Sequence, residues 1–198
     1  MSTQTLYRWG ALSVILTALL FAAAAIAVIV VPDGGLSNPV APILYYAGLI
    51  LAVPAYLTLY SAQSQYAGKL GFTGFVMAVV GSIMYSGPAF VLIAGTSGVA
   101  TWHDVWGFAM GNILPLGATI FLIGSILFGI ATRRANVFSR NAGLLLIMGA
   151  SVWLIAFFTA LPFSLSIANV LTASALSWMG TSLYSRNQLN TVQIRQTA

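Results

Sequence analysis

Six apolar stretches, each long enough to cross a lipid bilayer as a helix, run through this chain of 198 residues. About 20 apolar residues cover the roughly 30 Å hydrocarbon core, because a helix rises about 1.5 Å per residue. The stretches cover residues 9–31, 40–61, 71–94, 111–132, 142–161 and 165–184. Backbone groups in hydrocarbon must be hydrogen-bonded within the protein, and these continuous runs lack the alternation of a barrel strand. The sequence therefore predicts an all-α integral membrane bundle of six transmembrane helices in a single domain, with a polar tail over residues 185–198.

The composition excludes a soluble protein and several kinds of chemistry. Sixty per cent of the residues are hydrophobic and 5% are charged, whereas soluble domains carry about 25% charged residues. Cysteine and glutamate are both absent. The chain therefore has no disulfide framework or thiolate metal site, and it lacks the paired carboxylates of acid–base catalysis within the membrane.

The charges predict the orientation of the six spans, because short loops rich in lysine and arginine stay in the cytoplasm. With six spans and both termini cytoplasmic, every cation falls inside, while Asp33 and Asp104 fall outside. The cations are Arg8, Lys69, Arg133, Arg134, Arg140, Arg186 and Arg195. A five-span chain would break this separation by placing the last two outside. The pattern indicates a multi-pass protein of the bacterial inner membrane.

Two other interpretations, a cleaved signal peptide and a nucleic-acid-binding surface, do not fit the sequence. The first apolar run continues from Trp9 to Val31, which is too long for the apolar core of a cleaved signal peptide, about 7 to 15 residues. The basic residues are spread over four cytoplasmic segments and form no stripe with stacking aromatic residues. Membrane lipid, rather than nucleic acid, is therefore the expected partner of the positive charge.

The segment before the fourth span holds most of the polar chemistry. Thr101 with Asp104 fits a capping box at a helix start, and Trp102 and Trp106 lie four residues apart. This pattern predicts a short outer interfacial helix before helix four, anchored by aromatic residues at headgroup depth.

The competing hypothesis at this outer face is a metal or proton site. Asp33, His103 and Asp104 supply the needed ligand types, but no spacing brings Asp33 to the other two. A haem would need a second axial ligand at membrane depth beside the single histidine. No metal and no cofactor is therefore expected.

The sixth span has a polar stripe. At 100° per residue, its members fall within an arc of roughly 140°; they are Ser166, Asn169, Ser174, Ser177 and Thr181. Such a stripe should face protein or water rather than lipid. It either forms interhelical hydrogen bonds and close packing, or lines a polar cavity together with Tyr85.

Two hairpins in the middle of the chain follow a similar pattern. A shift of 68 positions along the sequence aligns Leu59 with Leu127 and Gly81 with Gly149. In both hairpins, one span leads into a basic inner turn and a glycine-containing span follows it. A parallel duplication and a similarity of composition alone both explain this correspondence.

The second of these hairpins carries a family resemblance. Its residues run from Leu116 through Leu127–Ala131 and Arg133–Gly143, and the first hairpin adds the Gly68–Gly71 turn. Together they resemble a pattern in small six-span bacterial membrane proteins of unknown function. The resemblance covers most of the chain. It implies a topology and no catalytic residues.

Two functions are consistent with these observations. The first is a non-catalytic multi-pass membrane protein acting as a structural or accessory subunit of a larger complex, with other membrane-protein subunits as partners. The alternative is a binding protein or carrier for a lipid or small apolar molecule, which would use a polar cavity beside helix six. No span contains the charged groups on which proton relays depend, so a coupled pump is disfavoured.

Overall fold

A computed structural model describes residues 3–30, 39–96, 107, 109–159 and 164–196. The helices there are α1 (Thr3–Val30), α2 (Val40–Thr96), the short π-helix η2 (Ala109–Ile113), α4 (Leu114–Ala135), α5 (Arg140–Thr159) and α6 (Ser164–Gln196). No strand occurs in these residues. Four of the helices, excluding α6, are long and apolar enough to cross a membrane. The predicted all-α fold is therefore confirmed for the described part of the chain.

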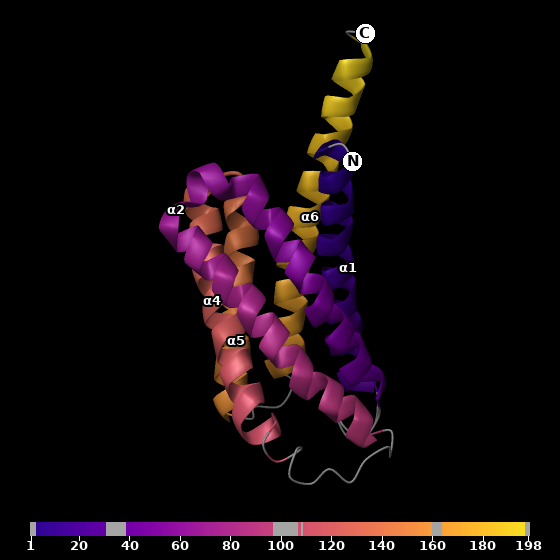
Figure 1. Ribbon diagram of the computed structural model, residues 1–198, viewed down its shortest axis with the longest axis vertical. Coiled ribbons are helices and arrows are strands. Elements are labelled where there is room, and N and C mark those ends of the chain that lie inside the picture. The colour runs from indigo at the N-terminus through magenta and orange to yellow at the C-terminus, as the bar shows by residue number, and fades with distance from the viewer. Residues whose placement is uncertain (1–2, 31–38, 97–106, 108, 160–163, 197–198) are drawn as a thin grey trace.

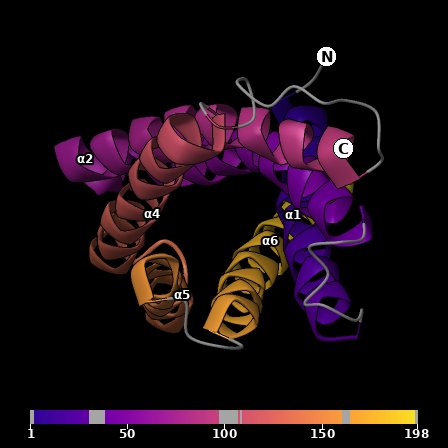
Figure 2. The same cartoon turned by 90° about the horizontal axis from the view of Figure 1, so that it is seen from below.

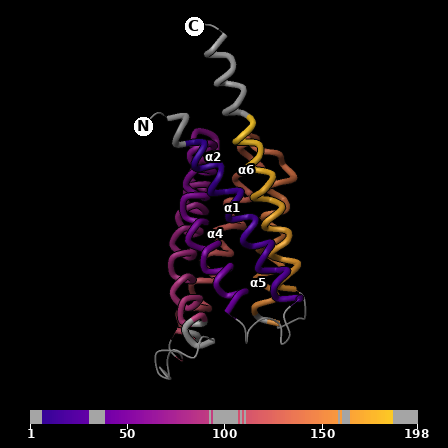
Figure 3. Tube along the Cα trace, turned by 90° about the vertical axis from the view of Figure 1, so that its right-hand side faces the viewer, coloured from indigo at the N-terminus to yellow at the C-terminus, as the bar shows by residue number. Residues whose placement is uncertain are grey.

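The helices form a closed ring. Seen along the bundle (Figure 2), α1, α2, α4, α5 and α6 follow one another, and α6 returns to pack against α1. The start of α1 and the end of α6 lie at the same end of the bundle (Figures 1 and 3). The turn inside α2 and the turn from α4 to α5 lie at that end too (Figure 1).

One glycine divides α2 into two arms. A straight helix of its 57 residues would be about 85 Å long at 1.5 Å per residue. Gly68 has φ 58° and ψ −163°, a conformation that residues with a Cβ rarely adopt. The helix reverses there (Figure 1), so residues 40–67 and 69–96 run in opposite directions. Residues 62–70, which separate the second and third predicted spans, are therefore helical except at Gly68, the first residue of the predicted Gly68–Gly71 turn.

Two other predicted segments lie at or beyond the ends of the helices. α6 continues to Gln196, so the polar segment predicted over residues 185–198 continues the sixth helix as far as that residue. The predicted interfacial helix around Thr101 to Trp106 lies outside the described residues, which resume continuously at η2 and lead directly into α4.

The turn between α4 and α5 corresponds to the turn at Gly68. Asn136, at the end of α4, has φ 55° and donates its backbone N–H to Thr132 O at 3.3 Å. Gly68 and Asn136 are the two positive-φ positions among the described residues, and they are separated by the same 68 positions that relate the two hairpins in the sequence. The backbone therefore supports the correspondence between the hairpins.

Glycines bring the second arm of α2 close to α4. A Cβ on Gly81 would lie 2.6 Å from Phe121 Cα and 2.9 Å from Gly117 O. A Cβ on Gly74 would lie 2.5 Å from Phe128 N. These neighbours are backbone atoms, so the two helices touch along their main chains.

Buried hydrogen bonds tie the first arm of α2 to its neighbours. Tyr56 Oη lies 2.7 Å from Ser125 Oγ on α4, and Gln63 Nε2 donates to Thr132 Oγ1 at 3.0 Å. Both pairs lie in the apolar core, where a polar group without a partner is costly. They fix the position of the first arm of α2 against α4.

Candidate functional site

The helices line a partly open cavity of about 110 Å³ at the end of the bundle away from the termini. Its position follows from the residues that line it: Val28 lies near the end of α1, while Ala41, Leu114 and Leu165 lie at or next to the starts of α2, α4 and α6. The complete lining set is Ala24, Val28, Ala41, Pro42, Tyr45, Tyr85, Pro88, Ala89, Leu114, Trp153, Leu165 and Asn169. All five helices of the ring contribute to it.

Three aromatic rings form the inner wall of the cavity. Tyr45 and Tyr85 come from the two arms of α2, and Trp153 comes from α5. The Tyr45 ring centroid lies 5.8 Å from that of Tyr85 and 6.0 Å from that of Trp153, while Tyr85 and Trp153 meet edge to face at 5.8 Å. Aromatic pairs at such separations stabilise one another beyond the area they bury. The rings therefore hold each other in fixed orientations.

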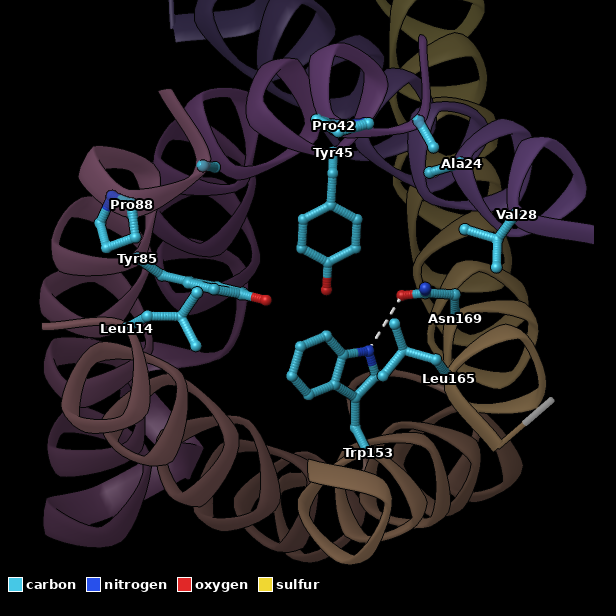
Figure 4. A pocket seen from close by; sticks show the side chains of 12 residues that line it. Ala24, Val28, Pro42, Tyr45, Tyr85, Pro88, Leu114, Trp153, Leu165 and Asn169 are labelled. Carbon is cyan, nitrogen blue, oxygen red and sulfur yellow. Dashed lines mark hydrogen bonds between the residues drawn. The ribbon is translucent and has the colours of Figure 1, made fainter. Parts of the chain in front are cut away.

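The polar groups of the cavity converge on its centre (Figure 4). Trp153 Nε1 donates to Asn169 Oδ1 at 3.3 Å, which satisfies the indole N–H. The hydroxyls of Tyr45 and Tyr85 point into the open space, and neither forms a hydrogen bond with the other lining residues drawn. Tyr85 is only 8% exposed and Asn169 only 3%. The cavity thus presents two hydroxyls with unused hydrogen-bonding capacity within apolar walls.

A smaller cavity of about 10 Å³ lies deeper in the bundle. It shares Tyr45, Trp153 and Asn169 with the larger one and adds Ser125 and Thr172 to its lining. A space of this size is about one water-sized sphere. Ser125, which lines it, lies 2.7 Å from Tyr56 Oη.

The described lining of the cavity is uncharged. None of the described residues around it carries a formal charge. The described residues also contain no group of three metal-ligating side chains. The residues predicted at the outer face, Asp33, His103 and Asp104, lie outside the described part of the chain.

The structure separates the predicted polar stripe of helix six into two parts. Asn169 lines the cavity together with Tyr85, while Ser166 is buried and donates weakly to Ala25 O of α1 at 3.4 Å. Thr181 is exposed and donates to carbonyls of its own helix, including Ser177 O at 2.9 Å. Neither Ser177 nor Thr181 is among the residues that line the cavity.

The sequence alone places Tyr45 at an interface and does not single out Trp153. One signal does point to the tryptophan, because it lies well inside an apolar span rather than at a boundary. A buried indole N–H usually needs a partner, and Asn169 is a strongly polar side chain on the adjacent span.

No family model, curated protein or solved structure matches the chain. The geometry alone therefore identifies the site, and the family resemblance stays a prediction.

Proposed function

We propose that this protein binds or carries a small, uncharged, mainly apolar molecule that has one hydrogen-bonding group. The observation behind this proposal is the pair of hydroxyls, from Tyr45 and Tyr85, that face an otherwise apolar cavity. Tyr45 is half-buried and Tyr85 is 8% exposed, and neither hydroxyl bonds to another lining residue drawn in Figure 4. A ligand hydroxyl or carbonyl placed between them would form hydrogen bonds of about 0.5–1.5 kcal/mol each, while the aromatic rings and the alanine and proline walls would contact the apolar body.

The size of the cavity favours a ring-sized ligand or the end of a longer one. Enclosed apolar cavities of about 150 Å³ bind benzene, and this cavity of about 110 Å³ lies where several helices begin or end. The absence of charge among the described lining residues disfavours an ionic ligand, since an unpaired charge in such surroundings is strongly destabilised.

The proposed topology has six spans and cytoplasmic termini. Each arm of α2 counts as one span because the helix reverses at Gly68. α6 is less apolar, but it contacts α1 at two levels of the ring: Ser166 reaches Ala25 O, and a Cβ on Gly180 would lie 2.8 Å from an Ile15 side-chain carbon. This antiparallel packing beside a membrane-length helix supports a sixth span.

The charge distribution supports the orientation. Lys69 follows the α2 reversal, and Arg133, Arg134 and Arg140 flank the α4–α5 turn. Both turns lie at the end of the bundle where α1 starts and α6 ends (Figure 3). The positive-inside rule then places this end in the cytoplasm and the aromatic cavity towards the outer leaflet. A bacterial inner membrane is the location we propose for this arrangement.

The accessory-subunit hypothesis has less support among the described features. Large apolar side chains are exposed on the outside of the ring, such as Leu19, Ile83 and Phe90, but lipid contact is sufficient to explain them. The aromatic cavity is the feature that lipid contact does not explain. A non-catalytic binding protein is therefore the function we favour, with membrane lipid as its surroundings and other subunits as further candidate partners.

The proposal is tested with two probes of nearly equal shape, 4-methylphenol and 1,4-dimethylbenzene. The first should raise the thermal unfolding midpoint of the purified protein in mild detergent more than the second, because only the phenol can bond to the tyrosine hydroxyls. Tyr45→Phe combined with Tyr85→Phe should abolish the difference between the probes. Tyr66→Phe is the control, because Tyr66 is 67% exposed and lies outside the cavity. An equal response to both probes in the unmodified protein would contradict the proposal.

A further inference from the structure

A third cavity, of about 370 Å³, lies at the α4–α5 turn, at the opposite end of the bundle from the aromatic cavity. Ile130, Arg133, Arg134 and Arg140 line it. We refer to it as the arginine pocket. It shares no residue with the aromatic cavity.

The backbone of the turn brings the three arginines together. Arg133 and Arg134 lie in the last turn of α4, and Arg140 is the first residue of α5. Asn136 reverses the chain between them with its positive φ of 55°. Its side chain also accepts a hydrogen bond from Arg140 Nε at 3.3 Å, which links that guanidinium to the turn.

A glycine lets one of the arginines lie across the neighbouring helix. Arg133 Cγ lies 2.7 Å from the position that a Cβ on Gly143 would occupy. A side chain at residue 143 would therefore displace the arginine stem. The missing Cβ leaves room for the stem of the exposed Arg133 to lie against α5 at the edge of the pocket.

The positive charge of the pocket is not neutralised by the described part of the chain. The whole sequence contains two acidic residues, Asp33 and Asp104, and both lie outside the described residues. Guanidinium groups that converge without a counter-charge repel one another and attract an anion. Arginine is suited to phosphate in particular, because its planar donors can form two parallel hydrogen bonds to phosphate oxygens.

We propose that the arginine pocket binds the phosphate of an anionic lipid headgroup. The membrane-length apolar segment ends at Ala135, so in the proposed topology, on which this inference rests, the arginines lie where α4 leaves the bilayer. Ile130, about one turn closer to the membrane interior, gives the pocket an apolar wall. A lipid can place its phosphate against the arginines and the start of its acyl chain beside this wall, whereas a free phosphate uses the arginines alone. Basic pockets between transmembrane helices on the cytoplasmic side bind such headgroups.

The test compares two sets of substitutions that remove equal charge. The full-length protein is purified in mild detergent with a mixture of dioleoylphosphatidylglycerol and dioleoylphosphatidylcholine, and the retained lipid is measured by native mass spectrometry. Arg133→Gln, Arg134→Gln and Arg140→Gln together should lower the retained phosphatidylglycerol about tenfold or more. Arg8→Gln, Lys69→Gln and Arg186→Gln remove the same charge elsewhere and should leave it within about twofold. Thermal unfolding of each set verifies that the protein is folded.

Two results would overturn the proposal. Equal losses of phosphatidylglycerol in the two sets would mean that the lipid responds to net charge rather than to the pocket. Displacement of phosphatidylglycerol by excess inorganic phosphate from the unmodified protein would mean that the site takes a soluble anion and needs no acyl chain. Retention of the lipid in the presence of phosphate, together with selective loss in the Arg133, Arg134 and Arg140 set, is the result we expect.

Discussion

Replacing Gly81 with alanine tests the close packing between α2 and α4. The added Cβ would lie 2.6 Å from Phe121 Cα and 2.9 Å from Gly117 O. Both are main-chain atoms, so no side-chain rotation can relieve the clash. Phe121 N would lie closer still, so α4 would have to recede by more than the 0.8 Å that brings Phe121 Cα to 3.4 Å, the lower limit of ordinary van der Waals distances.

The expected cost follows from two opposing effects. Overpacking a close contact costs about 1–3 kcal/mol, while alanine stabilises a helix interior by roughly 0.5–1 kcal/mol relative to glycine. The net effect should be a loss of about 1–2 kcal/mol in the free energy of unfolding. Tyr85 lies about one turn beyond Gly81 on the same helix, so its edge-to-face contact with Trp153, with centroids at 5.8 Å, should also loosen.

The assay is unfolding in mixed micelles with increasing dodecyl sulfate, followed by circular dichroism and tryptophan fluorescence. Val80→Ile is the matched control, because it also adds one carbon but at a neighbouring side chain that is 44% exposed. The control should change stability by less than about 0.5 kcal/mol. If Gly81→Ala were as stable as the unmodified protein, the helices could not be in main-chain contact at this level.

Three further predictions concern buried polar groups and orientation. Gln63→Leu should change the free energy of unfolding by less than about 1 kcal/mol in the same assay, because it removes both the hydrogen bond to Thr132, worth about 0.5–1.5 kcal/mol, and Gln63 Oε1, the one buried side-chain polar atom without a partner in the described residues. A loss well above about 1.5 kcal/mol would indicate that this oxygen is hydrogen-bonded as well. Asn169→Leu should lower the free energy of unfolding by about 0.6–1.7 kcal/mol. It should also change the fluorescence of Trp153, because the indole N–H loses its acceptor at 3.3 Å. Unchanged emission would contradict the hydrogen bond between Trp153 and Asn169. In intact cells, an impermeant thiol reagent should label Asp104→Cys but not Lys69→Cys, and the reverse pattern would contradict the orientation.

The sequence is sufficient to predict the helical class, because hydropathy over about 20 residues depends only on composition. The predicted spans end at residue 61 and resume at residue 71, with the turn at Gly68–Gly71. In the structure Gln63 is 0% exposed and bonds to Thr132 at 3.0 Å, so the helix continues as far as Gly68. The partner that buries Gln63 lies 69 positions away, which the local pattern does not reveal.

The candidate site is predictable only in part. Tyr85 and Asn169 do line the aromatic cavity, but the cavity depends on how five helices meet, and that arrangement places Tyr45 and Trp153 beside them. Thr181 shares the polar arc of α6 with Asn169, yet it is exposed. Serine and threonine hydroxyls can bond to carbonyls of their own helix, as Thr181 does, so a polar stripe need not face the interior.

The most direct measurement is of ligand occupancy in the aromatic cavity itself. 4-Fluorophenol added to the protein in lipid nanodiscs is observed by fluorine magnetic resonance, which distinguishes bound probe from probe dissolved in lipid. One saturable bound resonance per chain should appear in the unmodified protein. It should vanish in Ala24→Leu, which fills the cavity, and persist in Ala27→Leu, which alters the same helix at a residue outside the cavity lining. No bound resonance, or one that survives Ala24→Leu, would show that the cavity is not the binding site.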